Sequence, residues 1–194
     1  FYLTDHSQAT KKLAFDNLHR RLWVISNKKD AFIWIAAPDT GQVIASRDVS
    51  DDLSPTASNY PVLDTVVDAQ RELLYVLLND VSGNRVAIYD TSLHSVGDIL
   101  VGQEFRTLRW DESRDALLAL TAPKPGSDMP SKIFTVPRGA EASMTSLEPD
   151  LGGSHATRPP SEFAFEPSGD FFLAGQNKLW RIDAATGAQV WEAL

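Results

Sequence analysis

Residues 13–26 read LAFDNLHRRLWVIS, and three later segments of the chain align with them without a gap. The other copies are TVVDAQRELLYVLL from residue 65, LRWDESRDALLALT from residue 108 and FAFEPSGDFFLAGQ from residue 163. In every copy an apolar run ends in an acidic residue, and a second apolar run begins six residues beyond that acid, in the same register. Because short β-rich runs on either side of a tight turn are typical of hairpins, the repeat predicts four copies of one strand pair.

An acidic residue precedes the turn in each copy, at Asp16, Asp68, Asp111 and Glu166. A carboxylate at this position can accept hydrogen bonds from backbone N–H groups of the turn. We therefore expect the four acids to cap turns, at equivalent positions at the end of the innermost strand of each repeat. Catalysis is the poorer interpretation, since copies spread over a repeat do not gather at one site.

A second strand pair follows each hairpin, and its clearest copies are AFIWIAAPDTGQVIAS at 31–46 and KLWRIDAATGAQVWEAL at 178–194. Trp34 and Trp180 occupy the same column of the repeat, as do Gly41 and Gly187. A glycine in the turn suits a positive φ angle. The pattern predicts Trp180 on a third strand, Gly187 in a turn, and Trp191 on a fourth strand with its ring covered by a neighbouring repeat.

The repeats predict four four-stranded units, at about 11–50, 62–102, 105–148 and 161–194, within one domain or segment spanning 1–194. The excess residues form Pro- and Ser-rich loops at 49–61, 122–131 and 147–160. Insertions that are confined to loops are typical of repeat architectures.

These motifs resemble β-propeller families. KLWRIDAATGAQVW is similar to the tryptophan-docking repeat of quinoprotein-like propellers, and VAIYDTSLHSVGDILVG at 86–102 resembles YVTN-type propellers. The resemblance implies an all-β fold, a WD-like β-propeller with four visible four-stranded antiparallel blades. Propellers contain four to eight blades. Because each repeat supplies all four of its own strands, we expect part of a seven- or eight-bladed ring, with FYLTDH at 1–6 as an outer strand of a preceding blade or the closing strand of the last. The chain begins without Met, so we expect a processed product or an internal segment.

Composition restricts the partners. The formal net charge of −8 and the pI near 4.9 argue against nucleic acid, because binding to a phosphate backbone needs clustered Lys and Arg. No apolar run approaches the length of about 20 residues that a membrane-spanning helix needs. The chain contains no cysteine, which excludes disulfides, thiolate metal sites and cysteine nucleophiles.

No residue pattern points to catalysis, a cofactor or a metal. The histidines (His6, His19, His94 and His155) have no metal-ligand spacing and fall in turns or loops, where solvated side chains are the expected interpretation. No GxSxG elbow or phosphate-binding glycine loop occurs. Asp51–Asp52 and the PGSDMPS loop lack the alternating oxygen ligands of a calcium site. The basic runs at 11–12, 19–21 and 28–29 are interpreted as a solvated turn surface, and the tryptophans as packing between blades. We predict no catalytic, cofactor-binding or metal residue.

The leading interpretation is a non-enzymatic propeller scaffold that presents loops and blade edges to a protein partner or a larger assembly. In an alternative interpretation, the chain is part of a propeller enzyme, either a lactonase or hydrolase or a quinoprotein-type dehydrogenase. The cofactor-binding residues of those dehydrogenases match no position here. A further alternative is a secreted or periplasmic sensor or adhesion domain, which the absence of cysteine permits.

Overall fold

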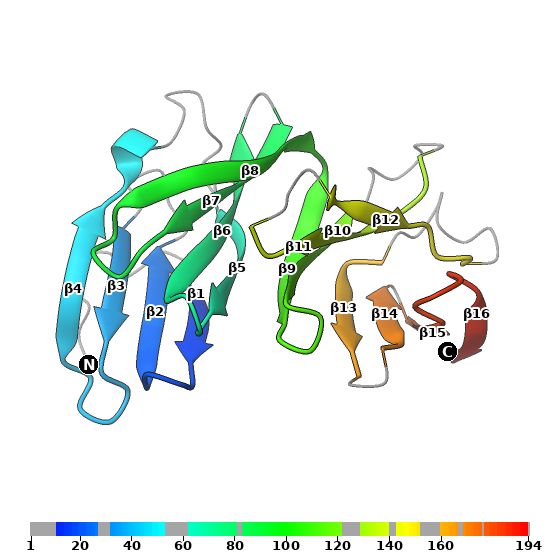
Figure 1. Ribbon diagram of the computed structural model, residues 1–194, viewed down its shortest axis with the longest axis horizontal. Coiled ribbons are helices and arrows are strands. Elements are labelled where there is room, and N and C mark those ends of the chain that lie inside the picture. Colours follow the sequence, from blue (N-terminus) through cyan, green and yellow to red (C-terminus); the bar gives the residue numbers. More distant parts are fainter. Residues whose placement is uncertain are drawn as a thin grey trace. The chain divides into compact units, whose positions relative to one another are not determined.

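The computed structural model describes residues 11–26, 32–52, 62–80, 83–121, 129–139, 143–151, 160–166, 169–175 and 177–193. The chain divides into two compact units, residues 1–103 and 104–194, and each is considered by itself (Figure 1). The first contains β1 (Lys11–Asp16), β2 (Arg21–Ser26), β3 (Phe32–Ala36), β4 (Val43–Asp48), the 3₁₀ helix η1 (Ser50–Asp52), β5 (Val62–Asp68), β6 (Leu73–Asp80), β7 (Gly83–Tyr89) and β8 (Ser95–Gln103). The second contains β9 (Phe105–Asp111), β10 (Ala116–Thr121), β11 (Ile133–Pro137), β12 (Thr145–Leu147), β13 (Glu162–Phe165), β14 (Phe171–Gly175), β15 (Lys178–Ile182) and β16 (Gln189–Ala193).

The strands form four four-stranded sheets, and each sheet is an antiparallel meander in chain order. Blade 1 consists of β1 to β4, blade 2 of β5 to β8, blade 3 of β9 to β12 and blade 4 of β13 to β16. The all-β class and the four antiparallel blades are therefore confirmed. Among the described residues, no helix has the length and apolar character needed to cross a membrane.

The first strand of each blade is its inner strand. β1 lies against β5 in the first unit, and β9 lies against β13 in the second. The fourth strands β4 and β16 are largely exposed to solvent. The predicted place of the turn acids is confirmed, because β1, β5 and β9 end in Asp16, Asp68 and Asp111, and Glu166 directly follows β13.

The register of the first hairpin differs in blade 4. In blade 1 Asp16 pairs with Arg21, and the acids of blades 2 and 3 pair in the same way with the residue five positions on. In blade 4 Phe165 pairs with Phe171, and the Glu166 N–H donates to the carbonyl of Asp170. The expectation of one register in all four copies is therefore wrong for blade 4, because its loop is one residue shorter.

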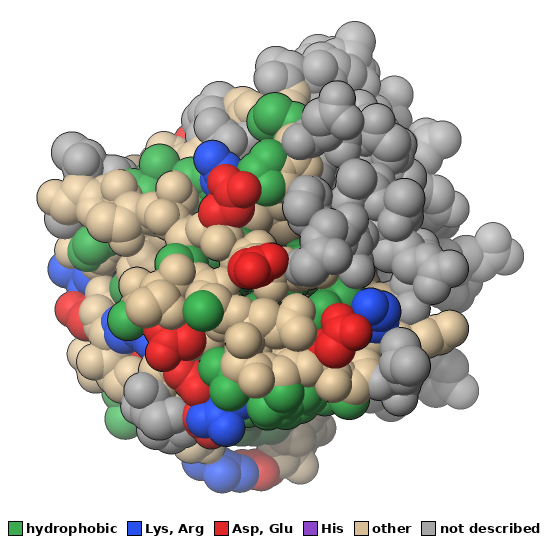
Figure 2. Space-filling view, turned by 90° about the vertical axis from the view of Figure 1, so that its right-hand side faces the viewer, with side chains coloured by type: hydrophobic (Ala, Val, Ile, Leu, Met, Phe, Trp, Pro, Cys, Tyr) green, Lys and Arg blue, Asp and Glu red, His purple; other side chains and the backbone are tan. Residues whose placement is uncertain are grey.

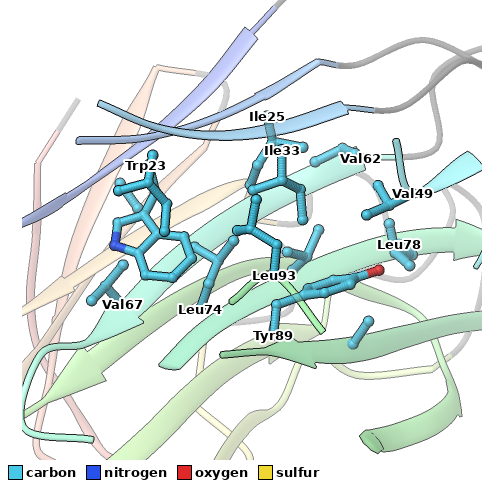
Figure 3. Close-up of a cluster of buried hydrophobic side chains, with 14 residues drawn as sticks. Trp23, Ile25, Ile33, Val49, Val62, Val67, Leu74, Leu78, Tyr89 and Leu93 are labelled. Carbon is cyan, nitrogen blue, oxygen red and sulfur yellow. The ribbon is translucent and has the colours of Figure 1, made fainter. Parts of the chain in front are cut away.

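An apolar core fills the space between the two sheets of the first unit. Trp23, Ile25 and Ile33 of blade 1 pack in one buried cluster with Leu74 and Leu78 of blade 2 (Figure 3). These side chains alternate along their strands with residues of the other face, which is the expected pattern for stacked sheets.

A second core lies between blades 3 and 4. Leu118 and Ile133 of blade 3 pack in one cluster with Phe163, Leu173 and Trp180 of blade 4. The Trp180 ring is completely buried. Burial of Trp180 on the third strand therefore confirms one prediction from the tryptophan columns.

The outer hairpin of blade 4 follows its equivalent in blade 1. Gly187 has a φ of 76° and Gly41 a φ of 70°, and each N–H donates to the carbonyl four residues earlier. A Cβ atom at Gly187 would also lie 2.8 Å from the carbonyl oxygen of Glu148. The predicted turn glycine is confirmed, and both its φ and its surroundings require glycine.

The prediction that a neighbouring blade covers Trp191 is wrong for this structure. Trp191 lies on β16 as expected, but its side chain is 37% exposed. Its ring lies across its own sheet from Phe172, with the centroids 6.2 Å apart. The position of Trp191 along its strand follows from the sequence repeat, whereas the burial of its ring depends on which element packs against that face of the sheet.

Candidate interaction surface

Three buried aspartates cap the turns between the first and second strands. Oδ1 of Asp68 accepts hydrogen bonds from the backbone N–H groups of Gln70 (3.1 Å) and Arg71 (3.2 Å). Asp16 and Asp111 accept the same kind of bond, and the exposed fraction of all three residues is zero. Turn capping is therefore confirmed for these three acids.

The second carboxylate oxygen of two of these acids binds a basic side chain three residues further on. His19 Nδ1 lies 3.0 Å from Asp16 Oδ2, and Arg114 Nη1 donates to Asp111 Oδ2. Burial by itself raises the pKa of Asp111, but the hydrogen bonds from Ser113 and Arg114 outweigh burial and lower that pKa below its ordinary value. The basic run at 19–21 is thus partly engaged by the turn acid, which sequence reasoning missed.

The last turn residue before the second strand has a left-handed backbone in three blades. The φ angle is 51° at Arg20, 56° at Glu72 and 52° at Asp115. This conformation brings Cβ close to the following carbonyl, so it costs free energy in any residue other than glycine. The aspartate that caps the start of each turn helps to hold the turn in this left-handed conformation.

The turns of blades 1 and 2 meet in a polar group of side chains. We call Asp16, His19, Arg21 and Glu72 the turn cluster. Arg21 Nη1 donates to Glu72 Oε1, and His19 Nε2 lies 3.8 Å from the same oxygen. Asp16 is buried, whereas the other three side chains are about one-third exposed. The cluster therefore joins two blades and still offers charged groups to solvent.

The turns of blades 3 and 4 are also joined, through Arg114. Its Nη2 atom donates to the Gly169 carbonyl at 2.5 Å, and its guanidinium lies 5.2 Å from the centre of the Phe171 ring. The carboxylate of Glu166 binds Arg181 Nη2 at 2.9 Å. Capping by Glu166 would involve residues 167 and 168, which lie outside the described residues, so it stays a prediction.

The remaining candidate residues are dispersed. His94 lies exposed in the turn after β7, and its backbone N–H donates to Asp90. Asp52 pairs with Arg47, and its carbonyl accepts a hydrogen bond from Arg85, so its contacts tie η1 to neighbouring strands. His6, His155, Lys28, Lys29 and most of the 122–131 loop lie outside the described residues.

Within the described ranges, no group of three or more His, Asp or Glu side chains has the geometry of a metal site. Burial and the nearby Asp52 carboxylate raise the pKa of Tyr89, so this phenol stays protonated. The arrangement can present fixed charges and hydrogen-bonding groups, which is the chemistry of recognition.

Solved structures with a similar fold identify the architecture of these four sheets. One is a chain of a nidogen/laminin complex, at 16% sequence identity and a TM-score of 0.65, which covers 91% of this chain and 61% of that chain. The fold is a β-propeller. Another is the Pan2 WD40 domain of Neurospora crassa, at 12% identity and a TM-score of 0.61, with 98% of this chain and 51% of that chain covered. At these identities the similarity defines the fold alone.

No protein-family profile matches the propeller chain, and no curated protein sequence matches it. The chain spans 61% and 51% of the length of the two solved structures above.

Proposed function

We propose that these blades, at about 11–50, 62–102, 105–148 and 161–194, form a non-enzymatic module that binds a protein partner within a larger protein or assembly. The turn cluster carries the proposal. Its partly exposed His19, Arg21 and Glu72 side chains are already held by contacts within the fold. Charged groups that are ordered before binding reduce the entropy lost on association, and they orient the approaching partner.

Two further observations support a binding role. The turn aspartates are buried and accept hydrogen bonds from their own turns, so their carboxylates stabilise these turns. One of the similar solved structures is a nidogen/laminin complex. A nucleic-acid partner is disfavoured by the net charge of −8.

The test compares two charge reversals in an affinity capture with the full chain as bait. Glu72→Lys reverses a charge in the turn cluster, and Glu192→Lys makes the same change on β16 in the other unit. We expect the unmodified chain and the Glu192→Lys variant to capture the same proteins, and the Glu72→Lys variant to lose them. Raising the salt concentration should release the captured proteins. An unchanged set of proteins with a folded Glu72→Lys variant would contradict this role of the turn cluster.

The enzyme alternative has its own measurement. The quinoprotein-like and YVTN-type resemblance stays a prediction, as does the ring of seven or eight blades. A ligand that binds the native state raises the unfolding temperature. If pyrroloquinoline quinone with calcium gives no thermal shift at saturation, the quinoprotein version is excluded. A clear rise in the unfolding temperature would support that enzyme class and contradict the non-enzymatic interaction module.

A further inference from the structure

The ring of His19 has a carboxylate oxygen beside each of its nitrogens. Nδ1 lies 3.0 Å from Oδ2 of Asp16 in the same turn, and Nε2 lies 3.8 Å from Oε1 of Glu72 in the first turn of blade 2. Asp16 is itself fixed, because it is completely buried and its Oδ1 accepts the backbone N–H of His19 at 2.9 Å. Blade 1 therefore holds the ring by Nδ1, and the other nitrogen lies beside blade 2.

The two contacts determine where the ring carries its hydrogens. An ionised carboxylate only accepts hydrogen bonds, so the 3.0 Å contact with Asp16 requires a hydrogen on Nδ1. A neutral imidazole has a single N–H group, and Nε2 then has a lone pair. A lone pair at 3.8 Å from the Glu72 carboxylate makes no hydrogen bond. A second proton can only bind to Nε2, the nitrogen that lies beside the next blade.

Glu72 can accept this additional donor. Arg21, the first residue of β2, already donates to Oε1 of Glu72. A carboxylate offers about four lone-pair sites, so one carboxylate can bind a guanidinium and an imidazolium together. The side chains of His19, Arg21 and Glu72 are each about one-third exposed, so small movements of the rings and chains are free to shorten the contact.

Two further arginines belong to the same turns. Arg20 follows His19 directly, and its guanidinium binds Asp39 at 2.8 Å. Arg71 precedes Glu72 in the turn of blade 2; it is exposed, and its backbone N–H donates to Asp68. The carboxylates of Asp16 and Glu72 are thus the acidic groups beside the His19 ring among the described residues.

Blade 3 shows what a permanent cation does at the equivalent position. Arg114 follows Asp111 by three residues, as His19 follows Asp16. Its Nη1 atom donates to Asp111, and its Nη2 atom donates to the carbonyl of Gly169 in the following blade at 2.5 Å. A guanidinium keeps its charge and its donors at every accessible pH. This turn position can therefore connect one blade to the next, and in blade 3 the connection needs no proton uptake.

The second unit relies on permanent charges in general. No histidine is among the described residues of that unit. Figure 2 views the side on which β16 lies in Figure 1, and it shows Lys or Arg side chains beside Asp or Glu side chains there. Histidine at the interblade position is thus a feature of blade 1.

We propose that His19 is a proton-operated tie between blades 1 and 2, in which protonation of Nε2 creates a hydrogen bond to Glu72. Imidazole is the side chain that ordinarily changes its charge between about pH 5 and 8. The proton also raises the summed charge of His19, Arg21 and Glu72 from zero to +1. Control of partner binding by this charge rests on the proposed function of the turn cluster, whereas the tie itself does not.

The first measurement is ¹⁵N NMR of the histidine rings in the full chain at pH 8 and pH 5.5. The His19 signals are those that disappear in His19→Gln. At pH 8 we expect the hydrogen on Nδ1, and at pH 5.5 hydrogens on both nitrogens. The Nε2–H signal should be visible at pH 5.5 and lost to exchange with water in Glu72→Gln. The exposed His94 is the internal control, whose ring signals should not respond to Glu72→Gln.

The second measurement is the urea midpoint at the same two pH values. A bond that only the protonated ring makes stabilises the fold at low pH, and this stability is lost as the pH rises. Glu72→Gln should therefore lower the midpoint more at pH 5.5 than at pH 8. In a His19→Gln background the loss should be equal at both pH values, because only the Arg21 contact remains. In a His19→Arg background the loss should be equal at both and larger, because the cation is permanent.

Three results would overturn the proposal. They are a His19 ring with its hydrogen on Nε2 at pH 8, an Nε2–H signal that is equally visible in Glu72→Gln, and an equal midpoint loss at both pH values in the unmodified background. None of these measurements involves a partner protein. Their failure would remove the proton-operated tie and leave partner binding at the turn cluster to be decided by its own capture experiment.

Discussion

Asp111 is a turn aspartate whose titration is linked to stability. Its folded-state pKa lies below the ordinary value of 3.8, because Ser113 and Arg114 stabilise the carboxylate. A lowered pKa contributes stability that is complete above the unfolded-state pKa and is lost as the pH falls through the folded-state pKa.

We therefore expect acid to destabilise the chain below about pH 4, partly through Asp111. Asp111→Asn should lower the free energy of unfolding at pH 7 by about 1–3 kcal/mol and reduce the loss of stability on acidification. Urea denaturation at pH 7 and at pH 3 measures both effects. Parallel pH profiles for the variant and the unmodified chain would show that Asp111 contributes nothing to the acid response.

Arg20 tests the left-handed turn position. Arg20→Gly and Arg20→Ala both remove its exposed ion pair with Asp39, so their difference isolates the backbone. Glycine has no Cβ penalty at a φ of 51°, and we expect the glycine variant to be more stable than the alanine variant by about 1 kcal/mol. Denaturation midpoints with equal slopes provide the comparison. A more stable alanine variant would argue against this backbone conformation.

At the residue scale, contacts within one turn were predictable from the sequence, whereas contacts between two blades were not. Capping by Asp16, Asp68 and Asp111 was predictable, because a turn carboxylate reaches N–H groups only two or three residues away. The contact of the His19 ring with Asp16 is equally local, and the recurrence of His or Arg three residues after the acid was the signal for it. The contact of His19 with Glu72 was not predictable, since it joins two blades.

At the scale of the strands, the two tryptophans of the last hairpin should behave differently. Trp180 is completely buried, so Trp180→Ala should cost about 3–5 kcal/mol through lost contacts and a residual cavity. Trp191→Ala should cost less than about 1 kcal/mol, because that ring is partly exposed and lies over one face of its own sheet.

His155→Ala extends this comparison to the Gly-rich loop at 147–160, and we expect a change below about 0.5 kcal/mol. Chemical denaturation of the three variants provides the measurement, provided that unfolding stays cooperative. Equal midpoints for the Trp180 and His155 variants would place Trp180 on the surface, in conflict with the blade core.

The outer turn of blade 4 gives a second comparison at this scale. Gly187→Ala meets both an unfavourable φ of 76° and a backbone oxygen 2.8 Å from the new Cβ. Gly102 has a similar φ of 86° but no atom within 4 Å of a Cβ position. We expect Gly187→Ala to be the more destabilising by at least about 1 kcal/mol, measured as the difference in unfolding free energy. Equal losses would show that the turn relaxes away from Glu148.

At the scale of the whole molecule, the net charge of −8 dominates long-range interactions. We expect no retention on immobilised heparin at physiological salt, and strong retention on an anion exchanger at pH 7, because the protein repels polyanions. Elution from heparin only at raised salt would identify a basic surface that the net charge conceals, and would reopen nucleic acid as a partner class.

The sequence by itself determined the number of repeats, the strands, the turn acids and the turn glycine, because each depends on periodicity and on contacts within a few residues. Only the tertiary structure decided how these elements meet. It joined Arg21 to Glu72 and Arg114 to Gly169, shortened the last inner hairpin by one residue, and left Trp191 exposed while burying Trp180. The physical reason is that burial of one sheet face depends on the sheet packed against it, and no local pattern encodes the presence of that neighbour.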